Sequence, residues 1–201
     1  MIVIDLETSA SMFGMHNASI VSLGALEFEN PSNEFYGECK IDEGAEVDPK
    51  SLEINGFTHE QITDPSKQSV QELLTSFFTW AKSVNEKTFA GQAPMNDVNM
   101  LMRTADIHNI TFPLGYRTVD LHTICYVHAL MRGELIPLEE HTASDFGLDN
   151  ILAYVGLKAR PGAHNALGDT KLTAEALSRL INGVSLLPEY TAYPIPNHLS
   201  I

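Results

Sequence analysis

The sequence predicts a mixed α/β domain in which three antiparallel strands precede a series of parallel β-α units. Residues 2–7 alternate in the manner of a β-strand and begin with β-branched side chains. Residues 70–84 instead place apolar side chains at the three-and-four spacing of an amphipathic helix. After residue 88, strand-like and helix-like patterns alternate, which is the order of an α/β sheet flanked by helices.

The first three strands follow one another with short connections, as in a meander. After the strand at residues 2–7, a second covers roughly Ser19 to Glu29 and a third covers Glu34 to Ile41. We interpret Asn30-Pro31-Ser32-Asn33 as the turn between the last two, because Asn, Pro and Ser are frequent turn residues. Strands joined so closely are expected to pair antiparallel.

The remaining elements alternate between helix and strand. The helix at residues 70–84 precedes a short strand near Thr88 to Gly91, and a helix then starts at about Pro94, since proline suits the first turn. A fifth strand near Arg117 to Leu121 leads into the next helix. The last two expected helices lie over Leu148 to Val155, capped by Ser144 or Asp149, and from about Asn165 to Ile181.

Length and composition restrict the class of protein. The 201 residues suit one domain, and no apolar run approaches the ~20 residues that cross a bilayer. We expect a domain over residues 1–182 and a proline-containing C-terminal tail over residues 183–201. The N-terminus has no pattern typical of a secretory signal, and Cys39 and Cys125 are too far apart for a cysteine-rich metal site. A cytoplasmic protein is therefore expected.

The net charge of -14 argues against a protein that grips nucleic acid over a broad basic surface. An acidic chain still acts on a polyanion where bound cations neutralise a cluster of carboxylates. Contact with nucleic acid is thus expected to be local.

Four carboxylates and one histidine stand out by position. Asp5 and Glu7 share one face of a predicted buried strand, where two like charges repel each other unless a cation holds them. Asp97 lies in the first turn of a helix, and Asp169 lies in the last helix, five residues after His164. Each also has a purely structural interpretation, such as a favourable charge at a helix start or an exposed helical acid.

These residues, taken in order, resemble the DEDDh exonucleases. The matching segments are Asp5-Leu-Glu7-Thr8, residues 19–26, residues 55–62 around His59, then Asp97, and finally His164-Asn-Ala-Leu-Gly-Asp169. The superfamily includes the proofreading subunit of bacterial replicative polymerases, RNase T and oligoribonuclease. The resemblance covers about residues 1–182 and implies an RNase H-like fold with a mixed five-stranded sheet.

The resemblance also implies roles for the five residues. Asp5, Glu7, Asp97 and Asp169 are expected to hold two divalent ions, and His164 is expected to act as the general base. We assign Asp5 to both ions, Glu7 and Asp169 to the ion that activates water, and Asp97 mainly to the other. Hard oxygen ligands favour Mg²⁺ or Mn²⁺. The His164 pKa is expected to rise beside these carboxylates.

Contacts with the terminal nucleotide are expected around the first strand. The backbone amides of Leu6 and Thr8, with Met12 or Phe13 nearby, are the expected groups, although Met12 and Phe13 equally suit the core. The chain departs from the family where Ser9-Ala10 replaces Thr-Gly and where Asn96 precedes Asp97 in place of an aromatic residue. Asp106 is the weaker alternative to Asp97. Lys158 and Arg160 are interpreted as solvated loop charges rather than phosphate contacts.

The expected function is a 3′-to-5′ exonuclease that releases nucleoside monophosphates from the 3′ end of single-stranded or frayed DNA or RNA. Two alternatives stay open: a catalytically silent nucleic-acid-binding accessory subunit, and a phosphohydrolase of small nucleotides. The choice between ribose and deoxyribose is not decided by sequence. Homodimers occur among the RNA-acting relatives, which leaves a homodimer open here.

Overall fold

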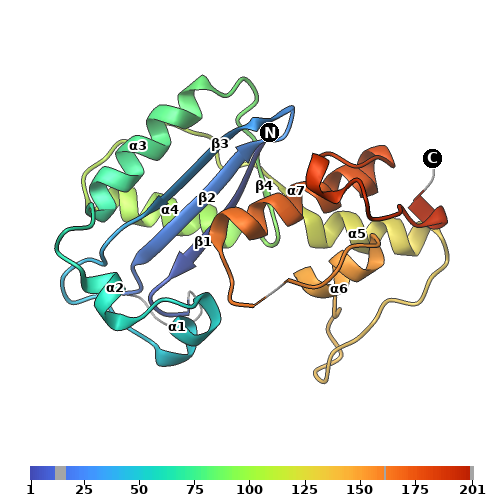
Figure 1. The fold of residues 1–201 in the computed structure, drawn as a ribbon, viewed down its shortest axis with the longest axis horizontal. Coiled ribbons are helices and arrows are strands. Elements are labelled where there is room, and N and C mark those ends of the chain that lie inside the picture. Colours follow the sequence, from blue (N-terminus) through green and yellow to red (C-terminus); the bar gives the residue numbers. More distant parts are fainter. Residues whose placement is uncertain (12–16, 161, 200–201) are drawn as a thin grey trace.

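The computed structural model describes residues 1–11, 17–160 and 162–199. Its centre is a five-stranded mixed sheet in the order β3-β2-β1-β4-β5 (Figure 1). The strands β1 (Ile2–Thr8), β2 (Ile20–Glu27) and β3 (Asn30–Glu38) pair antiparallel, whereas β4 (Phe89–Gly91) and β5 (Thr118–Asp120) continue the sheet in parallel. The expected fold class is confirmed.

Helices cover both faces of this sheet (Figure 1). One face packs against α3 and α4, and the other packs against α5, α6 and α7. Two short helices, α1 and α2, connect β3 to α3. The bounds are α1 Pro49–Asn55, α2 His59–Thr63, α3 Val70–Ser83, α4 Met95–Ile107, α5 Leu121–Met131, α6 Leu148–Tyr154 and α7 Ala166–Asn182.

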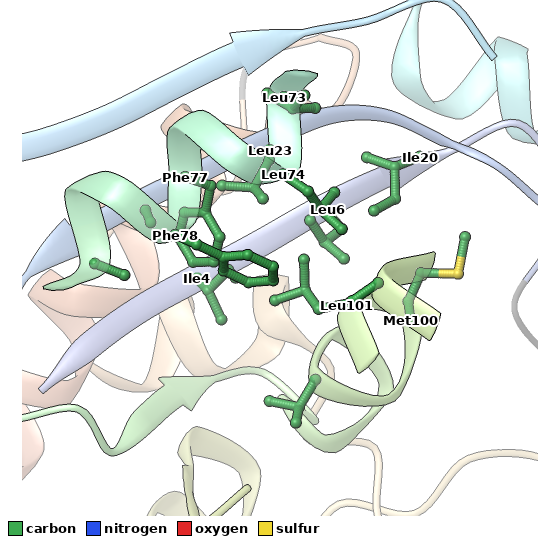
Figure 2. Packing of buried hydrophobic residues seen from close by; sticks show 14 of the residues in the cluster. Ile4, Leu6, Ile20, Leu23, Leu73, Leu74, Phe77, Phe78, Met100 and Leu101 are labelled. Carbon is green, nitrogen blue, oxygen red and sulfur yellow. The ribbon is translucent and has the colours of Figure 1, made fainter. Parts of the chain in front are cut away.

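The alternation of β1 decides which side chains face which layer. Ile2, Ile4 and Leu6 lie in the cluster with α3 and α4, where Phe77, Leu74 and Leu101 pack against them (Figure 2). Val3 belongs to the other cluster, with α5, α6 and α7. Because successive side chains alternate between faces, Asp5 and Glu7 share the face of Val3 and lie under α7.

Several boundaries differ from the sequence-based expectations. The turn between β2 and β3 lies at Phe28 and Glu29, and residues 30–33 belong to β3. The expected turn was wrong because β3 is an edge strand, which accommodates Pro31. The helix α6 is preceded by Gly147 without a side-chain cap, so neither Ser144 nor Asp149 caps it.

The segment from residue 49 to residue 63, for which the sequence predicted no helix, forms α1 and α2. Both helices have polar N-caps: Asp48 accepts from the amide of Lys50, and Thr58 forms a capping box with Gln61. These helices are too short to show a periodic apolar pattern, which is why sequence reasoning missed them.

Residues after Gly183 form two short 3₁₀ turns, Pro188–Tyr190 and Asn197–Leu199. Leu199 is buried in the cluster of α5, α6 and α7, and Tyr190 and Tyr193 pack against that cluster. The C-terminal segment therefore lies along the α6 and α7 side of the domain (Figure 1). Among the described residues, no helix has the length and apolar character to span a bilayer.

Candidate active site

The close approach of α7 to β2 brings the last helix over the carboxylates of β1. Asp5 pairs with Gly24 across the β1–β2 ladder. A Cβ atom at Gly24 would lie 2.4 Å from the backbone of Ala166 and Leu167, so only glycine admits the helix at this depth. The Thr170 hydroxyl then donates to the Gly24 carbonyl at 3.0 Å. These contacts fix the first turns of α7 beside Asp5.

The start of α7 has its own local determinants. Asn165 is the N-cap, and its side-chain oxygen accepts from the Gly168 amide at 2.9 Å. Asp169 lies in the first turn of the helix, where the positive end of the helix dipole favours a carboxylate. The backbone amide of His164 donates to the Ile54 carbonyl at 2.8 Å, so α1 holds the residues just before α7.

Asp97 joins the site from the opposite side of the sheet. It lies in the first turn of α4, which follows β4, and it is buried. One of its carboxylate oxygens accepts from the backbone amide of Leu6 at 3.1 Å. That hydrogen bond ties the start of α4 to β1 midway between Asp5 and Glu7. Asp106, the weaker sequence alternative, is exposed in the last turn of α4.

Glu7, His164 and Asp169 form the tightest group. One ligand atom from each of the three lies within 4.8 Å of the other two. His164 Nδ1 lies 3.9 Å from an Asp169 oxygen. The structure thus brings Glu7 together with His164, which lies 157 positions later in the sequence. Asp5 is close enough to Asp97, Glu7 and Asp169 for their charges to influence its ionisation.

Burial makes the carboxylates costly to ionise. Burial, followed by repulsion from Asp97, Glu7 and Asp169, holds the pKa of Asp5 well above its ordinary value. Burial, followed by repulsion from Asp169, raises the pKa of Glu7 to about 7. Burial also raises the pKa of Asp97 to about 8, although its backbone hydrogen bonds oppose the shift. Such a cluster is stabilised by bound cations.

Arg160 supplies the only positive charge that contacts this group among the described residues. Its Nη1 donates to Asp169 at 2.8 Å, and its Nε and Nη2 donate to Asp149 at 3.0 and 3.1 Å. These hydrogen bonds raise the Arg160 pKa against the opposing effect of burial. The interpretation of Arg160 as a solvated loop charge was wrong, because Asp149 and Asp169 hold it across the edge of the site. Lys158 is exposed, as expected.

His164 differs from expectation in its ionisation. Partial burial, followed by repulsion from Arg160, lowers the pKa of His164 below its ordinary value. Asp169 and Asp149 oppose this shift but do not reverse it. The expected rise was wrong because it counted the carboxylates but neither the partial burial of the imidazole nor the Arg160 guanidinium. The imidazole is consequently neutral near pH 7 and able to accept a proton.

The residues expected to contact a nucleotide differ in how accessible they are. Leu6 is 6% exposed and packs in the core, and its amide already donates to Asp97. The Leu6 amide is thus engaged within the protein, so its expected contact with a nucleotide is not available in this structure. Thr8 is partly exposed, and its hydroxyl donates to the Ala10 carbonyl at 2.8 Å. Met12 and Phe13 lie outside the described residues.

The donor set fits hard divalent cations. Carboxylate oxygens predominate, and a single imidazole stands beside them. Burial, followed by repulsion between the carboxylates, raises the pKa values of Asp5, Glu7 and Asp97, and the single cation Arg160 does not offset these shifts. Sequence reasoning interpreted Arg160 as a solvated loop charge and Asp149 as a possible helix cap, and so missed the ion pairs that bring both to the site; the only available signal was a basic residue four positions before His164.

Comparisons with known proteins agree with this geometry. A family model described as an exonuclease, of the RNase T family, matches residues 2–177. No curated protein matches the chain by sequence. Among solved structures, the nuclease domain of 3′hExo, a DEDDh family member bound to rAMP, has a TM-score of 0.69 at 14% identity, covering 92% of this chain and 93% of that domain.

Two further structures are similar over most of this chain. Cell-death related nuclease 4 has a TM-score of 0.70 at 17% identity, and the match covers 92% of this chain and 64% of that one. Exonuclease I of E. coli, in complex with a dT13 oligonucleotide, has a TM-score of 0.68 at 17% identity. The match covers 89% of this chain and 40% of that one. This chain therefore spans less than two thirds of either protein. At these identities the likeness establishes a shared fold.

Proposed function

Because the chain belongs to the RNase T family of exonucleases, we propose that it is a metal-dependent exonuclease that removes nucleoside monophosphates one at a time from the 3′ end of a single or frayed strand. The observation that carries this proposal is the convergence of buried carboxylates from β1, α4 and α7, of which only Asp169 pairs with an arginine, beside an imidazole whose pKa is lowered. The three nuclease structures compared above share the fold that positions these residues.

Four carboxylates would hold two Mg²⁺ or Mn²⁺ ions. Asp5 is central to the group and would contact both ions, Glu7 and Asp169 would hold one of them, and Asp97 would hold the other. When bound, such a pair makes a water nucleophilic near neutral pH and neutralises charge on the leaving oxygen. Arg160 would have to release Asp169 in exchange, while its hydrogen bonds to Asp149 keep it nearby.

His164 would accept a proton from the attacking water. The water oxygen then bonds to phosphorus, the bond from phosphorus to the 3′ oxygen breaks, and that oxygen takes a proton from solvent. The products are a nucleoside 5′-monophosphate and a strand with a new 3′ hydroxyl. Since the His164 pKa lies below its ordinary value, the acid limb of the pH–rate profile should lie below the pKa of free imidazole, ~6.5.

The ladder of products tests the proposal. Single-stranded DNA and RNA, each labelled at the 5′ end, are incubated with the protein and Mg²⁺ or Mn²⁺, and the products are resolved at single-nucleotide steps. Stepwise shortening from the 3′ end supports the proposal. Strands that bind but stay intact would indicate an accessory subunit, and hydrolysis of free nucleotides beside intact strands would indicate a nucleotide phosphohydrolase.

A matched pair of variants in α4 tests the metal-binding assignment. Asp97→Asn should abolish shortening, because it removes a buried ligand whose other oxygen is fixed by the Leu6 amide. Asp106→Asn makes the same change at an exposed position of the same helix and should leave the rate unchanged. Near-normal shortening by Asp97→Asn would show that Asp97 does not hold a catalytic ion.

A further inference from the structure

A cavity with Asp169 in its wall lies beside the carboxylate cluster. Its volume is about 370 Å³, and residues from three segments line it: the loop before α7, the first turns of α7 and the C-terminal segment. This volume is within the range of small-ligand sites, ~300 to 1,000 Å³. Asp169 and Arg160 belong to its wall, so a ligand in the cavity would also reach the proposed catalytic centre.

The C-terminal wall of the cavity is held in place by buried hydrogen bonds. Arg179 is fully buried, and its Nη2 donates to the carbonyl oxygens of Tyr190 and Tyr193 at 3.0 and 3.2 Å. Its partner Glu175 accepts from the amides of Leu186 and Leu187 at 2.8 and 2.9 Å. Both tyrosines are therefore fixed relative to α7, and both follow residue 177, where the exonuclease family match ends.

The chemistry of the lining is that of a base-stacking site. Tyr190 and Tyr193 contribute aromatic rings, and Leu157 and Leu172 contribute apolar surface. Lys158 Nζ stands 5.7 Å from the centre of the Tyr193 ring, and Arg160 provides a second cation. Aromatic rings beside cations are the arrangement with which proteins bind single strands without reading their sequence. In a chain with net charge -14, the exposed Lys158 ammonium is where a phosphate would be tolerated at this wall, because Arg160 is already paired with Asp149 and Asp169.

We propose that this cavity is a nucleobase subsite, walled by Tyr190 and Tyr193, for the nucleotide on the 5′ side of the scissile phosphate. The inference rests on the proposed function. A released mononucleotide occupies one side of the scissile phosphate, and its expected contacts are at Thr8, at the end of β1. The uncut strand would then lie on the cavity side of the carboxylates, because Asp169 borders the cavity.

The test removes either the nucleobase from the strand or the aromatic ring of Tyr193 from the protein. Single-stranded oligonucleotides, DNA and RNA, carry one abasic residue at the second position from the 3′ end, or at a distant position as a control. Binding is measured by fluorescence anisotropy in EDTA, and KM and kcat are measured with Mg²⁺. The protein variants are Tyr193→Ala, Tyr193→Phe, which keeps the ring, and Tyr116→Ala, a control at an exposed tyrosine outside the cavity.

Loss of one stacking contact should weaken binding and raise KM by about tenfold, with little change in kcat. Tyr193→Ala on the intact strand and wild type on the abasic strand should show this loss, and combining them should add nothing further. Tyr193→Phe and Tyr116→Ala should behave as wild type. The wild-type result with the abasic strand does not depend on how the Ala variant folds.

An equal affinity of the wild type for intact and abasic strands would overturn the subsite. So would a second tenfold loss when the abasic strand meets Tyr193→Ala, because the ring and the base would then act independently. Failure of the wild type to shorten any strand with Mg²⁺ or Mn²⁺ would instead overturn the proposed function. The anisotropy measurement in EDTA keeps these two failures distinct.

Discussion

The helix α7 carries two sets of buried charges that differ in how they are neutralised. In its C-terminal half, Glu175 and Arg179 are both 0% exposed and pair at 2.7 Å. The carboxylate also accepts from Ser185, Leu186 and Leu187, and the guanidinium donates to three backbone carbonyl oxygens. This pair is complete within the chain and connects α7 to the C-terminal segment and to Val155.

At the start of the same helix the balance is different. Asp169 meets one cation, Arg160, yet Glu7 and Asp97 are buried nearby, Asp5 is half-buried beside them, and the pKa of each of these three is raised. The contrast teaches that burial of a charge does not by itself identify a site. A buried charge with an internal partner belongs to the structure, whereas an excess of like buried charges indicates a place for cations from solution.

The largest effect that would sharpen this comparison is expected from Glu7→Gln. The loss of a metal ligand should lower kcat by about a thousandfold, since an ion at such a site contributes several kcal/mol to the transition state. In EDTA at pH 8 the free energy of unfolding should stay the same or rise, because one buried like charge is gone. Urea unfolding and strand shortening measure the two quantities. Lower stability with unchanged kcat would make Glu7 a structural residue.

The opposite pattern is expected from Arg179→Met. Glu175 would be left buried without its cation, which costs about 3–5 kcal/mol of unfolding free energy. Molecules that remain folded should keep the metal-dependent step. The control is Arg132→Met, which breaks the exposed pair with Glu134 and should cost less than about 1 kcal/mol. An equal loss of unfolding free energy for the two variants, measured with urea, would show that the buried pair of Glu175 and Arg179 stabilises the fold no more than an exposed pair does.

The smallest expected effect is the change with pH in the unfolding free energy of the metal-free protein. The pKa values of Glu7 and Asp97, about 7 and about 8, exceed those of carboxyl groups in the unfolded chain. The folded form thus binds more protons, and its stability in EDTA should fall as pH rises from about 5 to about 8, on the order of 2 kcal/mol. His164, whose pKa is lowered, contributes with the opposite sign.

Urea unfolding of wild type and Glu7→Gln at both pH values isolates the carboxylate contribution. The variant should show a shallower fall, because one of the groups that releases a proton over this interval has been removed. Added Mg²⁺ should restore stability more at the higher pH, where the carboxylates are ionised. A wild-type protein that is equally stable at both pH values in EDTA would contradict the excess of buried negative charge.

Local patterns were sufficient for much of the fold. The strand at Ile2–Thr8 and the helix at Val70–Ser83 follow from periodicity and capping, which depend on neighbours in sequence. The same alternation placed Asp5 and Glu7 on one face. The short helices α1 and α2, and the first residues of β3, were missed because such short or edge elements have little periodic signal.

The sequence by itself determined the fold class, the order of the motifs and the residue types proposed to hold cations, because each depends on local spacing or on a family pattern. Only the tertiary structure decided how Arg160 bridges Asp149 and Asp169, why the His164 pKa falls, and that Tyr190 and Tyr193 wall a cavity beside Asp169. Those features depend on distances between residues far apart along the chain, and on burial, which no local spacing encodes.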